Sequence, residues 1–310
     1  MINRRKFIKI AGSTGIVLGL GSLPLNLFAE DKSKNITITI LSTNDMHSRI
    51  EPFPSTDKHN PGMGGMAKRA ALIKKIRNLG NEVILLDAGD IFQGTPYYNE
   101  YHGALEIKLM TEMGYDAATI GNHEFDNGLD NLSSQISKAG FPFICSNYDF
   151  SRTPMSGKTI DYKIFEKSGI KIGVYGLGIE LKGLVFEKNY GKSIYLDPIE
   201  TALSYEKLLK EKGCNIIIAI SHLGFEYETD KVSDIKLAKA TSNTDIIIGG
   251  HTHTFLEKAE IVTNQNNREV VISQTGWGGI NLGKTDIIFS KKYMQIVSNS
   301  YTPKIINSQV

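Results

Sequence analysis

The sequence has few of the features that mark specialised classes of protein. It contains no internal repeat and no low-complexity tract, and only two of its 310 residues are cysteines. Cys145 and Cys214 each lie in or beside an apolar run, so we expect buried free thiols, although an exported location would permit a disulfide. The content of 41% hydrophobic and 22% charged residues is ordinary for a soluble globular protein, and the length suits one large domain or two small ones.

A strong excess of charge is also absent once the N-terminus is set aside. Residues 1–29 carry four positive charges and no negative ones, so without them the formal net charge moves from +2 to −2. A chain near neutrality lacks the basic surface that binds nucleic acid polymers. We therefore exclude nucleic acid polymers as partners.

Residues 1–29 have the composition of an export signal. Arg4, Arg5, Lys6 and Lys9 precede an uncharged, largely apolar run from Ile10 to Ala29. A basic start followed by a short apolar run is typical of a signal segment. Glycines and a proline interrupt the run, which makes it a poor permanent membrane helix.

The basic start has a more specific pattern. The stretch Asn3-Arg4-Arg5-Lys6-Phe7-Ile8-Lys9 resembles a twin-arginine signal, an address read by the twin-arginine export machinery. The alternative is an ordinary secretory signal with two adjacent arginines. Both interpretations predict a periplasmic or otherwise exported protein. Because Leu27 fits poorly with cleavage after Ala29, cleavage and retention as an uncleaved anchor both stay open.

Predicted strands and helices alternate after a polar linker at residues 30–35. Strands are predicted at residues 36–43, 83–87, 117–120, 143–147, 162–167, 170–177, 216–221, 245–248, 257–262, 269–273 and 284–290. Helices are predicted at residues 65–79, 102–113, 129–138, 199–212 and 234–240. This alternation predicts an α/β domain, and the hairpin-like pairs make its sheets mixed. We predict one domain at residues 36–290, followed by a mostly polar C-terminal tail at residues 291–310.

Polar side chains that can bind metals gather where five of the predicted strands end. They are Asp45, His47, Asp90, Asn122, His222, His251 and His253. Because sites in α/β sheets lie at the carboxyl ends of strands, we expect these side chains to meet. Asp-x-His and His-x-His pairs place both members on one side of an extended backbone. Oxygen and imidazole donors without a thiolate suit Mn, Zn, Fe, Co or Ni better than Ca or Mg.

The order of these motifs resembles that of the calcineurin-like metallophosphatases. The motifs are Asn44-Asp45-Met46-His47, Asp87-Ala88-Gly89-Asp90, Gly121-Asn122-His123-Glu124, His222 after a strand, and Gly250-His251-Thr252-His253. The first three are similar to the 5′-nucleotidase branch, and the resemblance covers residues 36–290. It implies a four-layer α-β-β-α sandwich with two mixed sheets, and it matches only the N-terminal metallophosphatase domain of that branch.

The resemblance also implies a role for each residue. Asp45, His47, Asp90 and His253 would hold one divalent metal ion, and Asp90, Asn122, His222 and His251 would hold the other, with Asp90 bridging. A hydroxide shared by the two metals would attack phosphorus. His123 would stabilise the transition state or protonate the leaving oxygen, and Asp126 would orient its imidazole. The alternative for Asp126 is a helix N-cap.

Five other residues near these motifs or elsewhere in the chain have simpler interpretations. Asp87 is predicted to be a buried hydrogen-bonding support for the metal loops, and Glu124 is predicted to be structural. His59 and His102 belong to no motif and are predicted at the surface. Trp277 lies between glycines, and we expect it to pack within a turn; the alternative is that it borders the pocket.

The predicted protein is an exported dinuclear-metal hydrolase of phosphate monoesters, with 5′-nucleotides or related nucleotides as substrates. The alternatives are a dimetal hydrolase of a sulfur ester, such as a thiosulfohydrolase, and a non-catalytic metal-binding subunit. The 5′-nucleotidases usually carry a second, C-terminal domain that stacks on the nucleoside base, and no residues here match its base-stacking pair. A separate nucleoside-binding subunit, a less specific single domain and a substrate other than a nucleotide all stay open.

Overall fold

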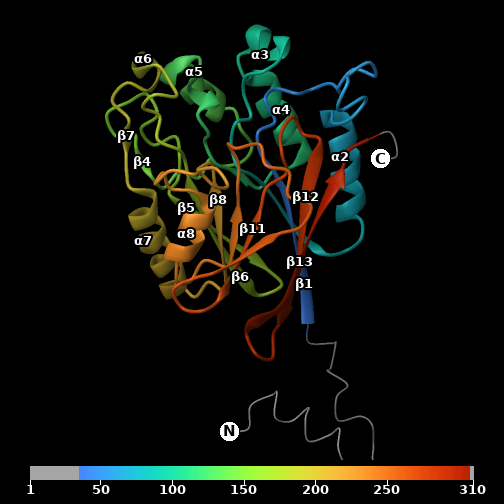
Figure 1. Cartoon of the computed structure of the whole chain (residues 1–310), viewed down its shortest axis with the longest axis vertical. Coiled ribbons are helices and arrows are strands. Elements are labelled where there is room, and N and C mark those ends of the chain that lie inside the picture. Colours follow the sequence, from blue (N-terminus) through green and yellow to red (C-terminus); the bar gives the residue numbers. More distant parts are fainter. Residues whose placement is uncertain (1–34, 308–310) are drawn as a thin grey trace, which may run out of the picture. The chain divides into compact units, whose positions relative to one another are not determined.

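The computed structural model describes residues 35–307 (Figure 1). The predicted signal at residues 1–29, the predicted linker apart from Asn35, and the last three residues of the predicted tail lie outside the described residues. None of the described helices has the length and apolar character that crossing a membrane requires.

The first sheet has five strands in the order β13-β12-β1-β2-β3. Its strands are β1 (Asn35–Thr43), β2 (Glu82–Asp87), β3 (Ala117–Ala118), β12 (Asn281–Ser290) and β13 (Gln295–Ile305). Strands β1, β2 and β3 are parallel, whereas β12 pairs antiparallel with both β1 and β13. The sheet is therefore mixed, and its three parallel strands end at the same edge.

The second sheet has six strands in the order β10-β11-β9-β8-β6-β5. Its strands are β5 (Tyr162–Lys167), β6 (Ile170–Leu177), β8 (Ile216–Ser221), β9 (Ile246–Ile248), β10 (Glu260–Thr263) and β11 (Glu269–Ser273). The four central strands are parallel, and antiparallel hairpins add β5 and β10 at the edges. A separate small pair joins β4 (Tyr148–Asp149) to β7 (Ile194–Tyr195).

Alternation along the strands builds two different cores. In β1, Ile38 and Ile40 face the apolar layer between the two sheets, whereas Leu41 faces a layer of helices. In β8, Ile218 faces the same central layer and Ile217 faces the helices on the other side. Successive side chains of a strand point to opposite faces, so an uninterrupted apolar strand requires cover on both.

Helices provide that cover. Helices α2 (Met66–Arg77), α4 (Ala104–Met113) and α5 (Gly128–Ile136) pack on the first sheet, and α7 (Pro198–Glu211) and α8 (Asp234–Ala240) pack on the second. Figure 1 shows α2 and α4 on one side of the strands and α7 and α8 on the other. The shorter α3 (Pro96–Tyr101), α6 (Glu187–Tyr190) and 3₁₀ helix η3 (His123–Phe125) lie in connections. The predicted four-layer α-β-β-α sandwich with two mixed sheets is confirmed.

Local sequence signals explain where the longer helices begin and end. Helix α7 begins after Asp197, whose carboxylate accepts hydrogen bonds from the backbone N–H groups of Ile199 and Glu200, both at 2.9 Å. Helix α4 ends at Gly114, whose φ of 71° is readily adopted only by glycine. These caps are the reason that the predicted helix boundaries lie close to the observed ones.

Three sequence-based expectations need correction. The predicted tail contains strand β13, which pairs along β12 and extends the first sheet beyond residue 290. The predicted strand at residues 143–147 is not one of the strands, because only Phe143 and Ile144 form isolated bridges to Ala118 and Ile160. The short helices α3 and α6 and the small β4–β7 pair were not expected. The prediction of buried free thiols at Cys145 and Cys214 is confirmed.

Candidate metal centre

The seven predicted ligands come together beyond the carboxyl ends of β1, β2, β3, β8 and β9. We call Asp45, His47 and His253 the first cluster, and Asp90, Asn122, His222 and His251 the second cluster. Within the described residues, the ligand atoms of Asp45, His47 and His253 lie within 4.8 Å of one another, as do those of Asp90, His222 and His251. The ligand atoms of Asp90, His47 and His123 also lie within 4.8 Å of one another. Asp90 therefore lies between the two clusters.

The first cluster brings three electron-pair donors toward one point. His47 Nε2 and His253 Nε2 are 2.9 Å apart. Asp45 Oδ1 lies 3.4 Å from His253 Nε2 and 4.0 Å from His47 Nε2. Nitrogen lone pairs this close repel each other unless a proton or a metal cation lies between them. The arrangement fits a divalent cation held by two imidazoles and a carboxylate.

The second cluster contains a buried nitrogen whose orientation is fixed from behind. His222 Nδ1 lies 2.7 Å from the carbonyl oxygen of Ala88, to which it donates a hydrogen bond, so Nε2 is the ring nitrogen left to bind a metal. Nε2 is buried, lies 3.0 Å from Asp90 Oδ2, and makes no hydrogen bond of acceptable geometry there. His251 Nδ1 lies 2.9 Å from Asn122 Oδ1. This donor set also fits a metal cation.

The electrostatics of the second cluster favour a cation. Burial, together with the charge of His222, lowers the pKa of His251 to about 4, so its imidazole is neutral at neutral pH and able to bind a metal. Burial also opposes the charged form of His222, but the carboxylates of Asp90 and Asp45 outweigh it and raise the pKa of His222 to about 10. The same negative field that stabilises a proton on His222 attracts a metal ion, which competes with that proton.

Backbone conformation at the site is unusual. Five of the predicted ligands have a positive φ that is rare outside glycine: Asp45 (49°), His47 (47°), Asp90 (55°), His251 (71°) and His253 (55°). Such conformations cost roughly 1–3 kcal/mol each and persist only where neighbouring structure holds them. Strain shared by the ligands of both clusters is the pattern expected of a site assembled for function.

His123 and Asp126 form a hydrogen-bonded pair next to the clusters. His123 Nδ1 lies 2.7 Å from Asp126 Oδ2, and both side chains are about one-third exposed. The backbone N–H of His123 donates to Asp90 Oδ1 at 2.8 Å. Burial lowers the pKa of His123, but the hydrogen bond to Asp126 and the charge of Asp90 outweigh it and raise that pKa to about 9. The N-cap of α5 is Asn127, so Asp126 is not the helix cap.

Two buried carboxylates hold the loops that carry the ligands. The side chain of Glu124 accepts hydrogen bonds from the backbone N–H groups of Asp90, Ile91, Phe92 and Gly121. The carboxylate of Asp87 accepts from Thr43 Oγ1 at 2.6 Å and from the N–H of Gly89 at 2.9 Å. These contacts agree with the predicted supporting roles of both residues.

The remaining sequence-based expectations concern two histidines and the tryptophan. His59 and His102 are exposed, as predicted. Trp277 lies in a turn and packs there against Phe53, as expected, and it also stacks on His253 with ring centroids 5.9 Å apart, so it borders the candidate site as the alternative proposed.

Two supporting side chains were not identified from the sequence. Asn44 Nδ2 donates to Asp45 Oδ2 and to the Gly276 carbonyl, which joins two loops. The side chain of Gln274 similarly bonds the segment Gly250–Thr254. The position of Asn44 directly before a predicted ligand was an available signal, whereas Gln274 had none.

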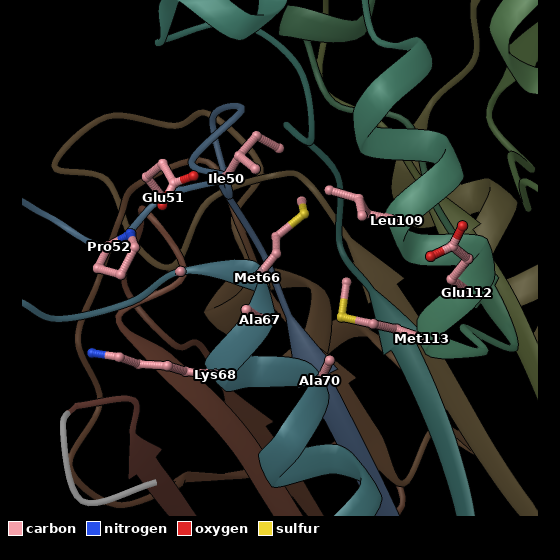
Figure 2. Close-up of a pocket in the computed structure, with 11 residues that line it drawn as sticks. Ile50, Glu51, Pro52, Met66, Ala67, Lys68, Ala70, Leu109, Glu112 and Met113 are labelled. Atoms are coloured by element: carbon pink, nitrogen blue, oxygen red, sulfur yellow. The ribbon is translucent and has the colours of Figure 1, made fainter.

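A separate cavity of about 360 Å³ lies between α2 and α4 (Figure 2). Its wall is mostly apolar and includes Met66, Leu109 and Met113, with Lys68 and Glu112 among the charged residues that line it. None of the predicted ligands lines this cavity, and neither does His123 or Asp126. It is therefore not part of the candidate metal centre.

Comparison with known proteins places this geometry in context. A family model described as calcineurin-like phosphoesterase matches residues 38–255. The 5′-nucleotidase of Rattus norvegicus is 33% identical over 301 residues, which cover 90% of this chain and 50% of that protein.

Two solved structures are also similar. The 5′-nucleotidase precursor from Thermus thermophilus aligns with a TM-score of 0.81 and 29% identity, covering 88% of this chain and 55% of that one. The calcineurin-like phosphoesterase YfkN from Bacillus subtilis aligns with a TM-score of 0.70 and 25% identity, covering 89% of this chain and 92% of that one. The chain spans about half the length of the 5′-nucleotidases that it matches.

Proposed function

The chain belongs to the calcineurin-like phosphoesterase family, and on this premise we propose that it hydrolyses phosphate monoesters with two divalent metal ions, 5′-nucleotides being its substrate class. The observation that carries the proposal is the joint presence of two ligand clusters and the His123–Asp126 pair beside them. Similarity to 5′-nucleotidases supports the substrate class.

The residues that would hold the metals follow from the two clusters. The first cluster would hold one ion and the second cluster the other, with Asp90 between them. Imidazole, carboxylate and amide donors suit Mn, Zn, Co, Fe or Ni. When bound, two such ions supply Lewis-acid activation of water and neutralise charge on the phosphoryl oxygens.

The other residues orient groups and move a proton. The carboxylate of Asp126 engages His123 Nδ1, so Nε2 is the ring atom left to face a substrate. From there His123 would donate a hydrogen bond to a phosphoryl oxygen or a proton to the leaving oxygen. Glu124 would keep the Asp90 and Asn122 loops in register, because its carboxylate bonds the backbone of both loops.

A substrate panel tests this function. The purified chain is loaded with Mn, Co or Zn in turn and assayed on AMP, a cyclic nucleotide, an aryl phosphate and a thiosulfonate. We expect AMP to be hydrolysed with the highest kcat/KM. Faster turnover of the thiosulfonate than of AMP would instead assign the chain to sulfur-ester hydrolysis, and metal binding without turnover of any substrate would assign it to a non-catalytic subunit.

We also propose a separate nucleoside-binding subunit as a partner. The support is that the chain spans about half the length of the 5′-nucleotidases that it matches. Affinity purification of the tagged chain from its host should recover a stable partner that lowers the KM for AMP. Recovery of a monomer with full activity on AMP contradicts this proposal.

Export through the twin-arginine machinery is the proposed route. The support is the Asn3–Lys9 motif, followed by the apolar run to Ala29. Arg4→Lys combined with Arg5→Lys should retain the protein in the cytoplasm, as measured by cell fractionation. Unchanged export of the double variant would indicate an ordinary secretory route.

A further inference from the structure

The turn Gly276–Gly279 holds the only tryptophan of the chain against the first cluster. The Trp277 ring stacks on His253 at a centroid distance of 5.9 Å and an interplanar angle of 17°. Phe53 meets Trp277 edge-on at 5.4 Å, and the Arg49 guanidinium lies 4.2 Å above the Phe53 ring. His253 thus belongs to a row of contacting side chains that runs from Arg49 through Phe53 and Trp277.

His253 differs from His222 and His123 in how its ring is oriented. The Ala88 carbonyl fixes His222 and the Asp126 carboxylate fixes His123, whereas the buried Nδ1 of His47 has no hydrogen-bond partner among residues 35–307. In the described part of the chain, no hydrogen bond to His253 Nδ1 is found, and the side chain is 41% exposed. Stacking on Trp277 covers the face of this ring, and the His47 ring contacts it edge-on at a centroid distance of 4.9 Å, so these two contacts limit its rotation.

The turn is itself tied to the first cluster. The N–H of Gly278 donates to the Asp45 carbonyl at 2.8 Å, and Asn44 Nδ2 donates to the Gly276 carbonyl at 2.7 Å. Trp277 therefore connects Asp45 and His253, two ligands of one cluster. No comparable contact from this turn to Asp90 or His222 is found within residues 35–307.

Glycine is required for this close packing at two positions. A Cβ on Gly279, at φ +62°, would lie 1.5 Å from Nη2 of the buried Arg69. A Cβ on Gly278, at φ +63°, would lie 2.9 Å from the Phe53 ring. The side chains of Arg69 and Phe53 thus pack directly against the backbone of the turn, which restricts where the Trp277 indole can lie.

We propose that Trp277 is a positioning residue that holds His253 in its metal-binding orientation and so sets the metal affinity of the first cluster alone. The inference rests on the proposed function, because it requires that the two clusters bind metal. Side chains that orient ligands typically change metal affinity about 10–100-fold when they are removed. Trp277 would do so by ring packing instead of a hydrogen bond.

Metal binding to the full chain tests the proposal. Zn²⁺ is titrated by equilibrium dialysis into the wild type, Trp277→Ala, Trp277→Phe and a control, Tyr293→Ala, which removes a half-exposed ring from the β12–β13 turn. We expect Trp277→Ala to bind one ion about 10–100-fold more weakly and the other with unchanged affinity. Trp277→Phe should recover most of the loss, because a flat ring remains, and Tyr293→Ala should match the wild type.

The outcomes separate this inference from the proposed function. A wild type that binds no metal refutes the proposed function. A wild type that binds two ions, with two unchanged affinities in Trp277→Ala, overturns the inference alone. Equal weakening of both sites also overturns it, because the effect would then be general. The unchanged second site reports that the variant is folded.

Fluorescence provides a direct second measurement. Because Trp277 is the only tryptophan, its emission reports from the wall of the first cluster. Titration with Co²⁺ should quench this emission in the wild type, and His253→Ala should shift the quenching to higher Co²⁺ concentration. Emission that does not respond while both sites fill would contradict contact between Trp277 and the first site.

Discussion

The two clusters use similar ligands but are held in different ways. In the second cluster, His222 is fully buried and a backbone carbonyl fixes its ring. In the first cluster, His253 is 41% exposed and an aromatic ring fixes it. Hydrogen bonding to a backbone is directional and is sheltered by burial, whereas stacking is weaker and tolerates small shifts. We therefore expect the second cluster to be the rigid site and the first to be the adjustable one.

The largest predicted loss of activity comes from replacing Asp90, the residue that lies between the clusters. Asp90→Asn should lower kcat/KM by about 10⁴-fold or more, since metal activation and proton transfer both depend on intact sites. Both metal affinities should fall, as measured by dialysis. Asp286→Asn, which changes a carboxylate that bonds Thr39 on β1, is the matched control and should retain activity. Loss of metal from only one site would show that Asp90 binds one ion and does not bridge the two.

The next largest loss of activity concerns His123 and Asp126, which belong to neither cluster. His123→Asn should lower kcat by about 10²–10⁴-fold, because proton donation is lost. Metal stoichiometry should stay at the wild-type value. Asp126→Asn should cost less, about 10–100-fold, since the imidazole remains but loses its orienting carboxylate. Unchanged turnover by His123→Asn would refute its catalytic role.

Graded chelation compares the two clusters directly. As a chelator is raised, the first cluster should lose its ion before the second, with midpoints separated by about tenfold or more, because exposed ligands exchange more readily. Bound metal and Trp277 fluorescence are followed together. The emission change should accompany loss of the first ion. Simultaneous loss of both ions would mean that the clusters act as one unit.

The smallest predicted effect comes from replacing buried glutamates, and it distinguishes a residue that supports the metal site from one that supports only the fold. Glu124 and Glu206 are both buried and both accept several backbone N–H bonds, from residues 90–92 and 121 and from residues 242–244, respectively. Replacing either by Gln should lower the free energy of unfolding by about 1–3 kcal/mol in urea titrations. Only Glu124→Gln should also weaken metal binding, by less than about tenfold. Equal metal affinities in the two variants would contradict a role for Glu124 in holding the site.

Much of the fold could be read from periodicity and caps. Strand β8 and the β5–β6 hairpin lie where they were predicted, because apolar runs are bounded by turn residues such as Ser168 and Gly169, both with positive φ. Strand β13 was missed because most of its residues are exposed and polar residues interrupt its apolar ones, and it is defined only by pairing with β12. A strand at a sheet edge needs no apolar signal of its own.

By itself, the sequence determined the chemistry of the site. Asp-x-His and His-x-His at strand ends specify which donors exist and at which edge they meet, because the carboxyl ends of parallel strands converge. The resemblance implied which donors share a metal, but only the tertiary structure gave their distances, since Asp45 and His253 are far apart in the chain and meet across the two sheets. It also decided that Trp277 orients His253, because a stacking contact between distant segments leaves no spacing in the sequence.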